Sequence, residues 1–172
     1  MSISNPRYTP DLAKGLVAGI VAGLLASFLM EQFQSLWKTA SEKLNPSQGD
    51  SESEDDPATV KAAQAISAGL IHKKIRRKNK VAAGEIMHYV MGGSSGAIYG
   101  VAAELTPIAT AGEGLALGTT VWAIADNGLV PALGLAKPPA KTPLSTHIYA
   151  LSSHLFYGFV TETVRRAIRA VL

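Results

Sequence analysis

The stretch GLVAGIVAGLLASF, residues 15–28, decides the fold that the sequence predicts. It carries no charged residue, and glycine recurs at every fourth position, at Gly15, Gly19 and Gly23. A helix needs about 20 largely apolar residues to cross a bilayer. Small residues spaced by four let two such helices approach closely within lipid. The stretch therefore predicts a transmembrane helix that packs through its glycines against another helix.

Three further segments have the same character and, together with residues 13–36, predict four transmembrane helices. They are residues 83–105, residues 113–135, and a segment from about Pro143 to the C-terminus. These segments are rich in Gly, Ala and Ser, and they lack the charged face that a surface helix of a soluble protein shows. A soluble helical bundle is the alternative for this composition. The second segment repeats the small-residue pattern at Gly92, Gly96 and Gly100.

Length and cysteine content restrict the fold and the chemistry further. A chain of 172 residues is the size of one domain, so we expect residues 1–172 to form a single membrane domain. The absence of cysteine excludes disulfides, thiolate metal sites and cysteine nucleophiles. The predicted fold class is all-α: a polytopic membrane protein with four transmembrane helices, Gly/Ala packing faces and one short interfacial helix.

The interfacial helix is expected between the first two spans, where the composition changes. NPSQGDSESEDDP, at residues 45–57, is acidic and serine-rich, so we expect residues 38–56 to form a disordered acidic loop. Residues 57–80 then predict a short helix, starting at Pro57 and followed by the basic run KKIRRKNK. This helix is too short to span the bilayer, so we expect it to lie along the membrane surface.

The distribution of basic residues predicts the orientation and excludes one class of partner. The first and third connections hold eleven Lys and Arg residues, against five at the two chain ends. The positive-inside rule then places both connections in the cytoplasm and both ends outside. A nucleic-acid partner is not expected, because the basic residues flank an apolar segment instead of covering a folded face.

A second stretch, HIYALSSHLFYGFVTETVRR at residues 147–166, places ionisable side chains inside the fourth segment. Depth can be counted from the side of the membrane that carries the Lys- and Arg-rich connection. Ionisable residues from all four segments then fall in the same half of the bilayer: Glu31, His88, Asp126, His147 and His154. An aspartate at the centre of a membrane helix costs about 2.5 to 3.5 kcal/mol. We therefore expect these side chains to face one another.

The predicted polar intramembrane site consists of His88, Asp126 and His154. Glu31, Asn127 and His147 are weaker candidates. Imidazole and carboxylate together can relay a proton or bind a divalent metal such as zinc. The three principal residues are therefore candidate metal ligands, and a divalent metal ion is the candidate cofactor. No compact motif such as HExxH is present, and hydrogen bonding between helices is the alternative role for His88.

Glu162, Arg165 and Arg166 have the helical spacing of local ion pairs. We interpret them as an anchor at the far membrane interface. Enzyme signatures are not found in the sequence: MGGSSGAIYG has neither the G-x-S-x-G spacing nor a P-loop lysine. A non-enzymatic protein is therefore expected.

Several of these motifs resemble the YagU-like family of bacterial inner-membrane proteins, whose function is not established. They are GLVAGIVAGLLASF, the histidine followed by GAIYGVAAELTP, VPALGLAKPP, and SHLFYGFVTETVRR. The resemblance implies a multi-pass protein of the bacterial inner membrane. The polar positions that it carries over are His88, Glu104, His154, Glu162, Arg165 and Arg166. Tyr99 and Pro131 also fit the family pattern. Asp126 departs from the family pattern, in which a histidine is expected in some relatives.

The leading functional hypothesis is a membrane protein that handles protons or a divalent metal ion at the buried His/Asp site. A single four-helix unit leaves little room for a transport path, so a homo-oligomer within the bilayer is the expected assembly. The first alternative is an accessory subunit that docks into a larger membrane complex through its glycine faces. The second is a haem-binding redox subunit with His88 and His154 as axial ligands.

Overall fold

The computed structural model describes residues 10–44 and 56–172, and most of these residues are helical. The α-helices are α1 (Leu12–Leu44), α2 (Ala58–Ile66), α3 (Lys80–Leu105), α4 (Leu115–Val121), α5 (Val130–Ala132) and α6 (Leu144–Val171). The π-helical segments are η1 (Ser67–Ile71) and η4 (Trp122–Leu129), and the 3₁₀ turns are η2 (Arg77–Asn79), η3 (Pro107–Thr110) and η5 (Pro139–Lys141). No strand occurs within the described ranges, which confirms the all-α class.

Local sequence explains where the long helices begin and end. The Asp11 carboxylate accepts a hydrogen bond from the N–H of Lys14 at 3.1 Å and so caps the start of α1. Thr106 ends α3 in an extended conformation, because the following Pro107 disfavours helical geometry in the residue before it. Pro143 stands directly before α6, where a proline needs no helical hydrogen-bond donor.

Four long helical rods form at the four positions that the sequence predicts. The third rod is made of α4, η4 and α5 in succession, and the others are α1, α3 and α6. Among the described helices, α1 alone is long and apolar enough, by length and composition, to cross a membrane. The other three rods do not meet this criterion, so the four-span arrangement stays a proposal.

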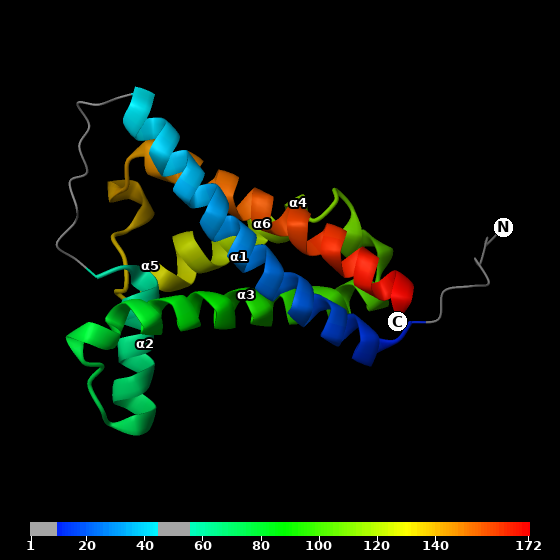
Figure 1. Cartoon of the computed structure of the whole chain (residues 1–172), viewed down its shortest axis with the longest axis horizontal. Helices are drawn as coiled ribbons and strands as arrows, with labels where there is room; N and C mark the ends of the chain where they lie inside the picture. Colours follow the sequence, from blue (N-terminus) through cyan, green and yellow to red (C-terminus); the bar gives the residue numbers. More distant parts are fainter. Residues whose placement is uncertain (1–9, 45–55) are drawn as a thin grey trace.

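The rods do not pack equally against one another (Figure 1). α1 packs against both α3 and α6, and α6 packs against α4. α3 and α4, both fully described, do not pack closely against each other. The bundle is therefore open along one side, between α3 and the rod that contains α4.

The six glycines that the sequence indicates as packing positions lie where α1 meets α3. A β-carbon added to Gly19 would lie 2.9 Å from the Cα of Gly100, and one on Gly96 would lie 2.8 Å from the Cα of Gly23. Both distances are shorter than a van der Waals contact, so no larger side chain fits between the two backbones. Ala18, Ala22 and Ala26 on α1 are fully buried as well. The two helices are therefore in contact through backbone atoms.

A second contact of this kind joins α4 to α6, and the sequence analysis missed it. A β-carbon on Gly118 would lie 3.0 Å from the Cα of Leu155, and one on Gly158 would lie 2.7 Å from the backbone nitrogen of Gly118. Gly114 starts α4 with a φ of +83°, which favours glycine at that turn. These glycines escape a search for evenly spaced small residues because Gly158 has no partner glycine on its own helix.

Larger side chains fill the contact between α1 and α6. Met30 on α1 packs with Tyr157 and Val160 on α6 in a buried cluster. Farther along the same contact, the rings of Phe33 and Phe156 stack with their centroids 4.9 Å apart. The α1–α6 contact therefore relies on ordinary side-chain packing, whereas the α1–α3 contact relies on glycine.

The structure corrects the predicted acidic loop and refines the interfacial helix. Residues 38–44 belong to α1, because KTASEKL is rich in helix-forming residues and continues the first rod. Of the remaining loop, residues 45–55 lie outside the described residues. The helix predicted in residues 57–80 forms as α2 and η1, and the basic run contains the turn η2. Val60 of α2 is buried, with its side chain against Gly84 of α3.

Candidate functional site

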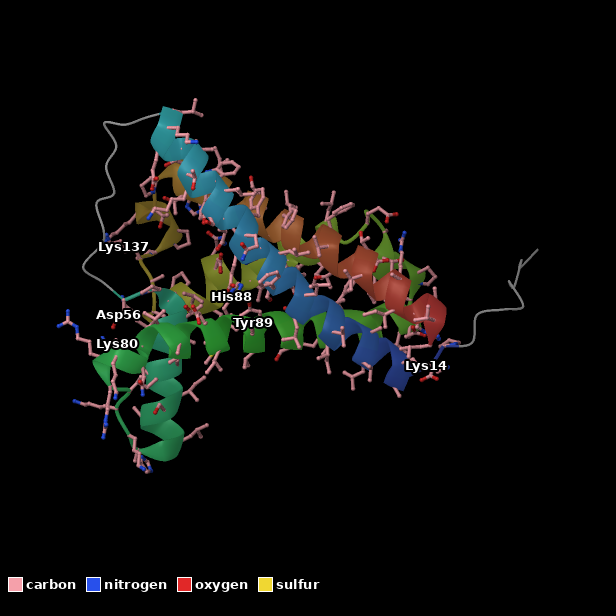
Figure 2. The ribbon with its side chains drawn as sticks, in the orientation of Figure 1. Lys14, Asp56, Lys80, His88, Tyr89 and Lys137 are labelled. Carbon is pink, nitrogen blue, oxygen red and sulfur yellow. The ribbon has the colours of Figure 1, made fainter. Side chains whose placement is uncertain are left out.

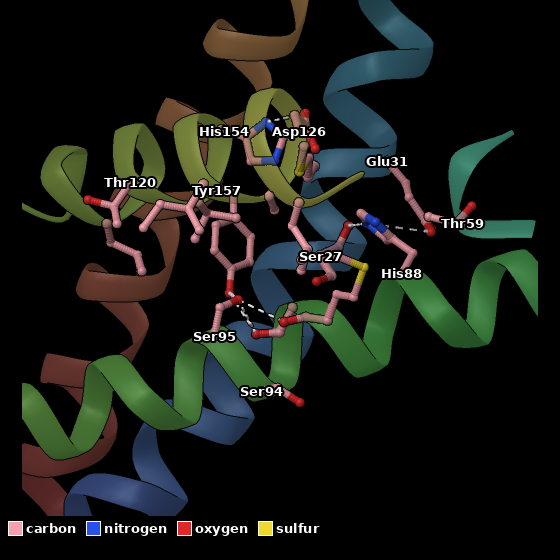
Figure 3. A pocket seen from close by; sticks show the side chains of 18 of the residues that line it. Ser27, Glu31, Thr59, His88, Ser94, Ser95, Thr120, Asp126, His154 and Tyr157 are labelled. Atoms are coloured by element: carbon pink, nitrogen blue, oxygen red, sulfur yellow. Dashed lines mark hydrogen bonds and ion pairs between the residues drawn. The ribbon is translucent and has the colours of Figure 1, made fainter. Parts of the chain in front are cut away.

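The open side of the bundle holds a cavity of about 1170 Å³. Its lining comes from α1, α2, α3, the α4–η4 rod and α6. Figure 3 shows the polar side chains at one end of this cavity, with Tyr157 and Ser95 deeper between the rods. Most of the remaining lining side chains are apolar. The cavity is therefore an apolar space with a polar end.

Asp126 and His154 face each other across this polar end, from η4 and α6. Their Oδ2 and Nδ1 atoms are 3.6 Å apart. The His154 side chain is mostly buried, and its Nδ1 also lies 2.8 Å from the carbonyl oxygen of Ala150. Since that carbonyl accepts a hydrogen bond, Nδ1 carries the proton and Nε2 is the free nitrogen when the ring is neutral. The structure thus brings together two of the three residues of the predicted polar site.

The π-helical turn explains the direction of Asp126. The N–H of Val130 bonds to the carbonyl of Ala125, five residues earlier, where an α-helix would use the fourth. The wider turn comes directly before Pro131, whose ring lacks an N–H and clashes with the α-helical hydrogen-bond pattern. The extra residue per turn rotates the preceding side chains relative to an α-helix. Such π-turns occur often at functional sites.

His88 and Glu31 form a second histidine–carboxylate pair that lines the same cavity, from α3 and α1. His88 Nε2 lies 3.9 Å from Glu31 Oε1 and 3.5 Å from the carbonyl oxygen of Ser27. The Tyr89 hydroxyl donates a 2.9 Å hydrogen bond to the other oxygen of Glu31. Glu31 therefore belongs to the site more directly than the sequence analysis expected. The sequence analysis missed Tyr89, although it directly follows a candidate histidine.

Hydroxyl groups line the middle of the cavity. The Tyr157 hydroxyl donates to the carbonyl of Gly92 at 2.6 Å and lies 3.0 Å from Ser95 Oγ. The Ser27 side chain is fully buried, and its Oγ has no hydrogen-bond partner among the described residues. Sequence reasoning missed all three residues, because Ser and Tyr in an apolar helix resemble ordinary packing residues until their neighbours are known.

Asn127 and His147, two of the weaker candidates, lie beside the main site. Both line a smaller cavity of about 250 Å³, and Asp126 lines this cavity as well as the large one. The Asn127 amide donates to the carbonyl of Trp122 at 3.0 Å. His147 Nε2 lies 3.1 Å from the carbonyl of Pro139. Both side chains therefore have backbone partners of their own, outside the large cavity.

The predicted ion pairs of Glu162 form at the opposite end of the bundle. The carboxylate is fully buried and accepts hydrogen bonds from Arg165 at 2.7 and 2.9 Å and from Arg166 at 2.5 Å. The Tyr99 hydroxyl donates a further 2.9 Å bond. Four hydrogen bonds thus hold one carboxylate, and they offset the free-energy cost of removing its charge from water. Sequence spacing predicted the two arginine partners, and tertiary structure added the tyrosine.

Glu104 forms a second buried carboxylate site at that end. It accepts hydrogen bonds from Arg169 of α6 at 2.7 and 3.3 Å and from the N–H of Asp11 at 2.9 Å. It therefore joins α3 to α6 and to the start of α1. Lys14 lies at this end in Figure 2, and its Nζ donates to the carbonyl of the C-terminal Leu172 at 2.7 Å.

A charged pair at the cavity joins the first residue of α3 to the segment before α2. Lys80 Nζ lies 2.5 Å from Asp56 Oδ2, and Gln64 donates to the same oxygen at 3.1 Å. The hydrogen bond from Lys80 lowers the pKa of the Asp56 carboxyl below its ordinary value. Both residues appear beside each other in Figure 2, at the end of the molecule opposite Lys14. The pair connects the segment before α2 to the start of α3.

The three candidate metal ligands are not gathered around a single point. His154 pairs with Asp126, whereas His88 pairs with Glu31. Over residues 10–44 and 56–172, no group of three or more His, Asp or Glu side chains is arranged to hold a metal ion. The geometry therefore provides two separate two-residue pairs that share one cavity.

Comparison with known proteins gives one match. A family model described as "Protein of unknown function (DUF1440)" matches residues 33–163. This range contains His88, Asp126 and His154, whereas Glu31 and the first glycine row precede it. No curated protein and no solved structure matches the chain. Because the family match covers more than half of the 172 residues, this chain belongs to the DUF1440 family of proteins of unknown function.

Proposed function

We propose that this protein crosses a membrane four times, through α1, α3, the α4–η4–α5 rod and α6. The composition of α1 supports the first crossing. Exposed apolar side chains that do not line the cavity support the other three, and among them are Val90 of α3, Leu115 of α4, and Ile148 and Phe159 of α6. Large apolar surfaces on every rod are costly in water and ordinary in lipid. The bacterial inner membrane and the YagU-like family, both from sequence resemblance, are parts of this proposal.

The absence of native cysteine makes the topology directly testable. Single substitutions Ser41→Cys, Gly112→Cys and Lys141→Cys place a thiol in the exposed last turns of α1, between α3 and α4, and before α6. We expect a membrane-impermeant maleimide to label the first and third from one side and Gly112→Cys from the other. The cysteine-free parent protein is the control. Labelling of all three from the same side would rule out four crossings.

Within this membrane domain, we propose that the two histidine–carboxylate pairs bind and release protons. The observation that carries this proposal is that Asp126–His154 and Glu31–His88 line one cavity, at 3.6 and 3.9 Å. Histidine changes charge near neutral pH, and a nearby carboxylate stabilises the charged ring. Two such pairs can exchange protons with any water or solute that enters the cavity.

Proton exchange fits the geometry better than the metal or haem hypotheses. A stable divalent site takes three or four protein ligands, and each pair here offers two. Axial ligation of a haem would require His154 to turn its free Nε2 toward His88 across the cavity. The accessory-subunit hypothesis has no specific contact in its favour. Metal analysis of the purified protein tests the metal hypothesis, and its visible absorption spectrum tests the haem hypothesis.

The proton proposal is tested by histidine NMR, because the chain has only four histidines. In ¹⁵N-histidine-labelled protein in lipid nanodiscs, the ring signals of His88 and His154 report directly on whether each histidine binds and releases a proton. Asp126→Asn removes the counter-ion of His154, so less of that ring should be protonated at a given pH. His72, which is exposed at the end of η1, is the internal control and should not respond. A His154 signal that ignores the substitution would contradict the proposal.

A further inference from the structure

We propose that the cavity between α3 and the α4–η4 rod binds a lipophilic organic cation, which competes with protons for Asp126 and Glu31. The inference rests on the proton exchange proposed above and names the class of substrate for that site. The ligand would have a bulky apolar body and a single positive charge, as a protonated amine or a quaternary centre has.

The charge of the lining supports a cationic ligand. Four carboxylates line the cavity, those of Glu31, Asp56, Glu85 and Asp126. Lys80 is the one Lys or Arg in the described lining, and it already pairs with Asp56. With neutral histidines the cavity thus has an excess of negative charge. A cation that enters gains these charges as partners, whereas an anion would face repulsion.

The shape and walls of the cavity support an apolar body. Its volume of about 1170 Å³ is large enough for a drug-sized molecule. The apolar lining includes Met30, Met91, Leu117, Val121, Ile124 and Leu129. Methionine side chains adapt to differently shaped ligands.

The same groups explain why protons should compete with the ligand. As the pH falls, the carboxylates are neutralised and the histidines become positively charged, so attraction for a cation declines. The titratable groups facing the cavity are Glu31 on α1, His88 and Glu85 on α3, Asp126 on η4, His154 on α6, and the Asp56–Lys80 pair. Each proton that these groups bind adds one positive charge and makes the cavity less attractive to a cation. Binding should therefore weaken as the pH falls.

Equilibrium dialysis of the purified full chain in a non-ionic detergent, with radiolabelled tetraphenylphosphonium, tests this inference. We expect saturable binding at pH 8 that falls on the order of tenfold by pH 5. Asp126→Asn and Glu31→Gln, each checked for folding by size exclusion, should each weaken binding at pH 8 on the order of tenfold, since each removes a charge partner of the ligand. Glu42→Gln is the matched control, because this exposed carboxylate on α1 lies away from the cavity.

Two results would overturn the inference. One is equal binding of triphenylphosphine oxide, which has a similar body and no charge. The other is unchanged tetraphenylphosphonium binding in the Glu31→Gln/Asp126→Asn double variant. If either result is obtained but the protonation of His154 still responds to Asp126→Asn, the cation-binding inference is wrong and the proton-exchange proposal stands. If binding depends on both carboxylates but not on pH, the proton competition is overturned.

Discussion

Both ends of the bundle pair carboxylates with basic side chains, but the carboxylates are buried at one end and border a cavity at the other. At the end with Lys14, Glu104 and Glu162 are buried and held by arginines at 2.5 to 3.3 Å. At the other end, Asp126 and Glu31 have histidines at 3.6 and 3.9 Å and border a cavity. At the first end, which we call the closed end, arginines match the charges of both buried carboxylates. The open end keeps its charges accessible, so burial of a charge there indicates chemistry, whereas at the closed end it indicates structure.

The largest expected effect comes from breaking the closed end. Glu162→Gln removes the charge that Arg165 and Arg166 share in a fully buried position. Breaking a buried ion pair from one side typically costs about 3 to 5 kcal/mol. We therefore expect a markedly lower midpoint of thermal unfolding in detergent. Glu42→Gln, an exposed carboxylate on α1, is the control and should change the midpoint little. Equal midpoints for the two variants would remove the distinction between the ends.

The next effect tests the glycine contact between α1 and α3. Gly96→Ala would push a methyl group against the backbone of Gly19 and Gly23, which has no side chain to move aside. Overpacking of this kind costs about 1 to 3 kcal/mol. Gly69→Ala is the matched control, since nothing lies within 4 Å of the added carbon. Thermal unfolding of both variants should separate them, and a Gly96→Ala protein as stable as the parent would show that the helices can move apart.

A smaller effect on stability is expected at the open end. Asp126 is only partly enclosed, with 40% of its side chain exposed to the cavity side, and its partner lies beyond an ordinary hydrogen bond. Asp126→Asn keeps the shape of the side chain, so we expect a loss of less than about 1 kcal/mol, in the range of exposed ion pairs. The same variant should weaken proton exchange, as set out above. A loss as large as that of Glu162→Gln would make the pair a structural one.

The smallest expected effect is the pH-dependent contribution of the Asp56–Lys80 pair to stability. Since Lys80 lowers the pKa of Asp56, this pair contributes stability that is fully present above the ordinary carboxyl value of about 3.9 and is lost as the pH falls through the lower folded value. Asp56→Asn should therefore lower the unfolding midpoint slightly at pH 7 and not at pH 2. Lys80→Met should have the same effect, and the double variant should add little. Additive losses would show that the two residues act separately.

Much of the fold could be predicted from sequence because it depends on local composition. The four rods follow from apolar stretches between polar connections, and the α1–α3 contact follows from two rows of evenly spaced glycines. The extent of α1 beyond residue 37 was missed, because charge content was taken as a sign of disorder where helix propensity prevails. The α4–α6 contact was missed, because Gly114 and Gly118 meet a lone glycine, Gly158, on another helix.

The candidate site was predictable only in part. Depth counting placed Asp126 and His154 in the same half of the bilayer, and the structure has them facing each other. It could not pair His88 with Glu31, because the rotation of α1 against α3 depends on which glycines meet. Tyr89, Ser95 and Tyr157 acquire their roles from neighbours 58 to 65 residues away in sequence. Such long-range partners leave no local pattern.

By itself, the sequence determined that the chain forms long helices, where small residues permit close packing, and which turns end each helix. These outcomes depend on periodicity, propensity and proline, which act within a few residues. Only the tertiary structure decided that α3 and α4 stand apart and leave a cavity, and that a π-turn before Pro131 directs Asp126 toward His154. Both depend on how whole rods are rotated against one another, and that rotation results from the sum of contacts between distant segments.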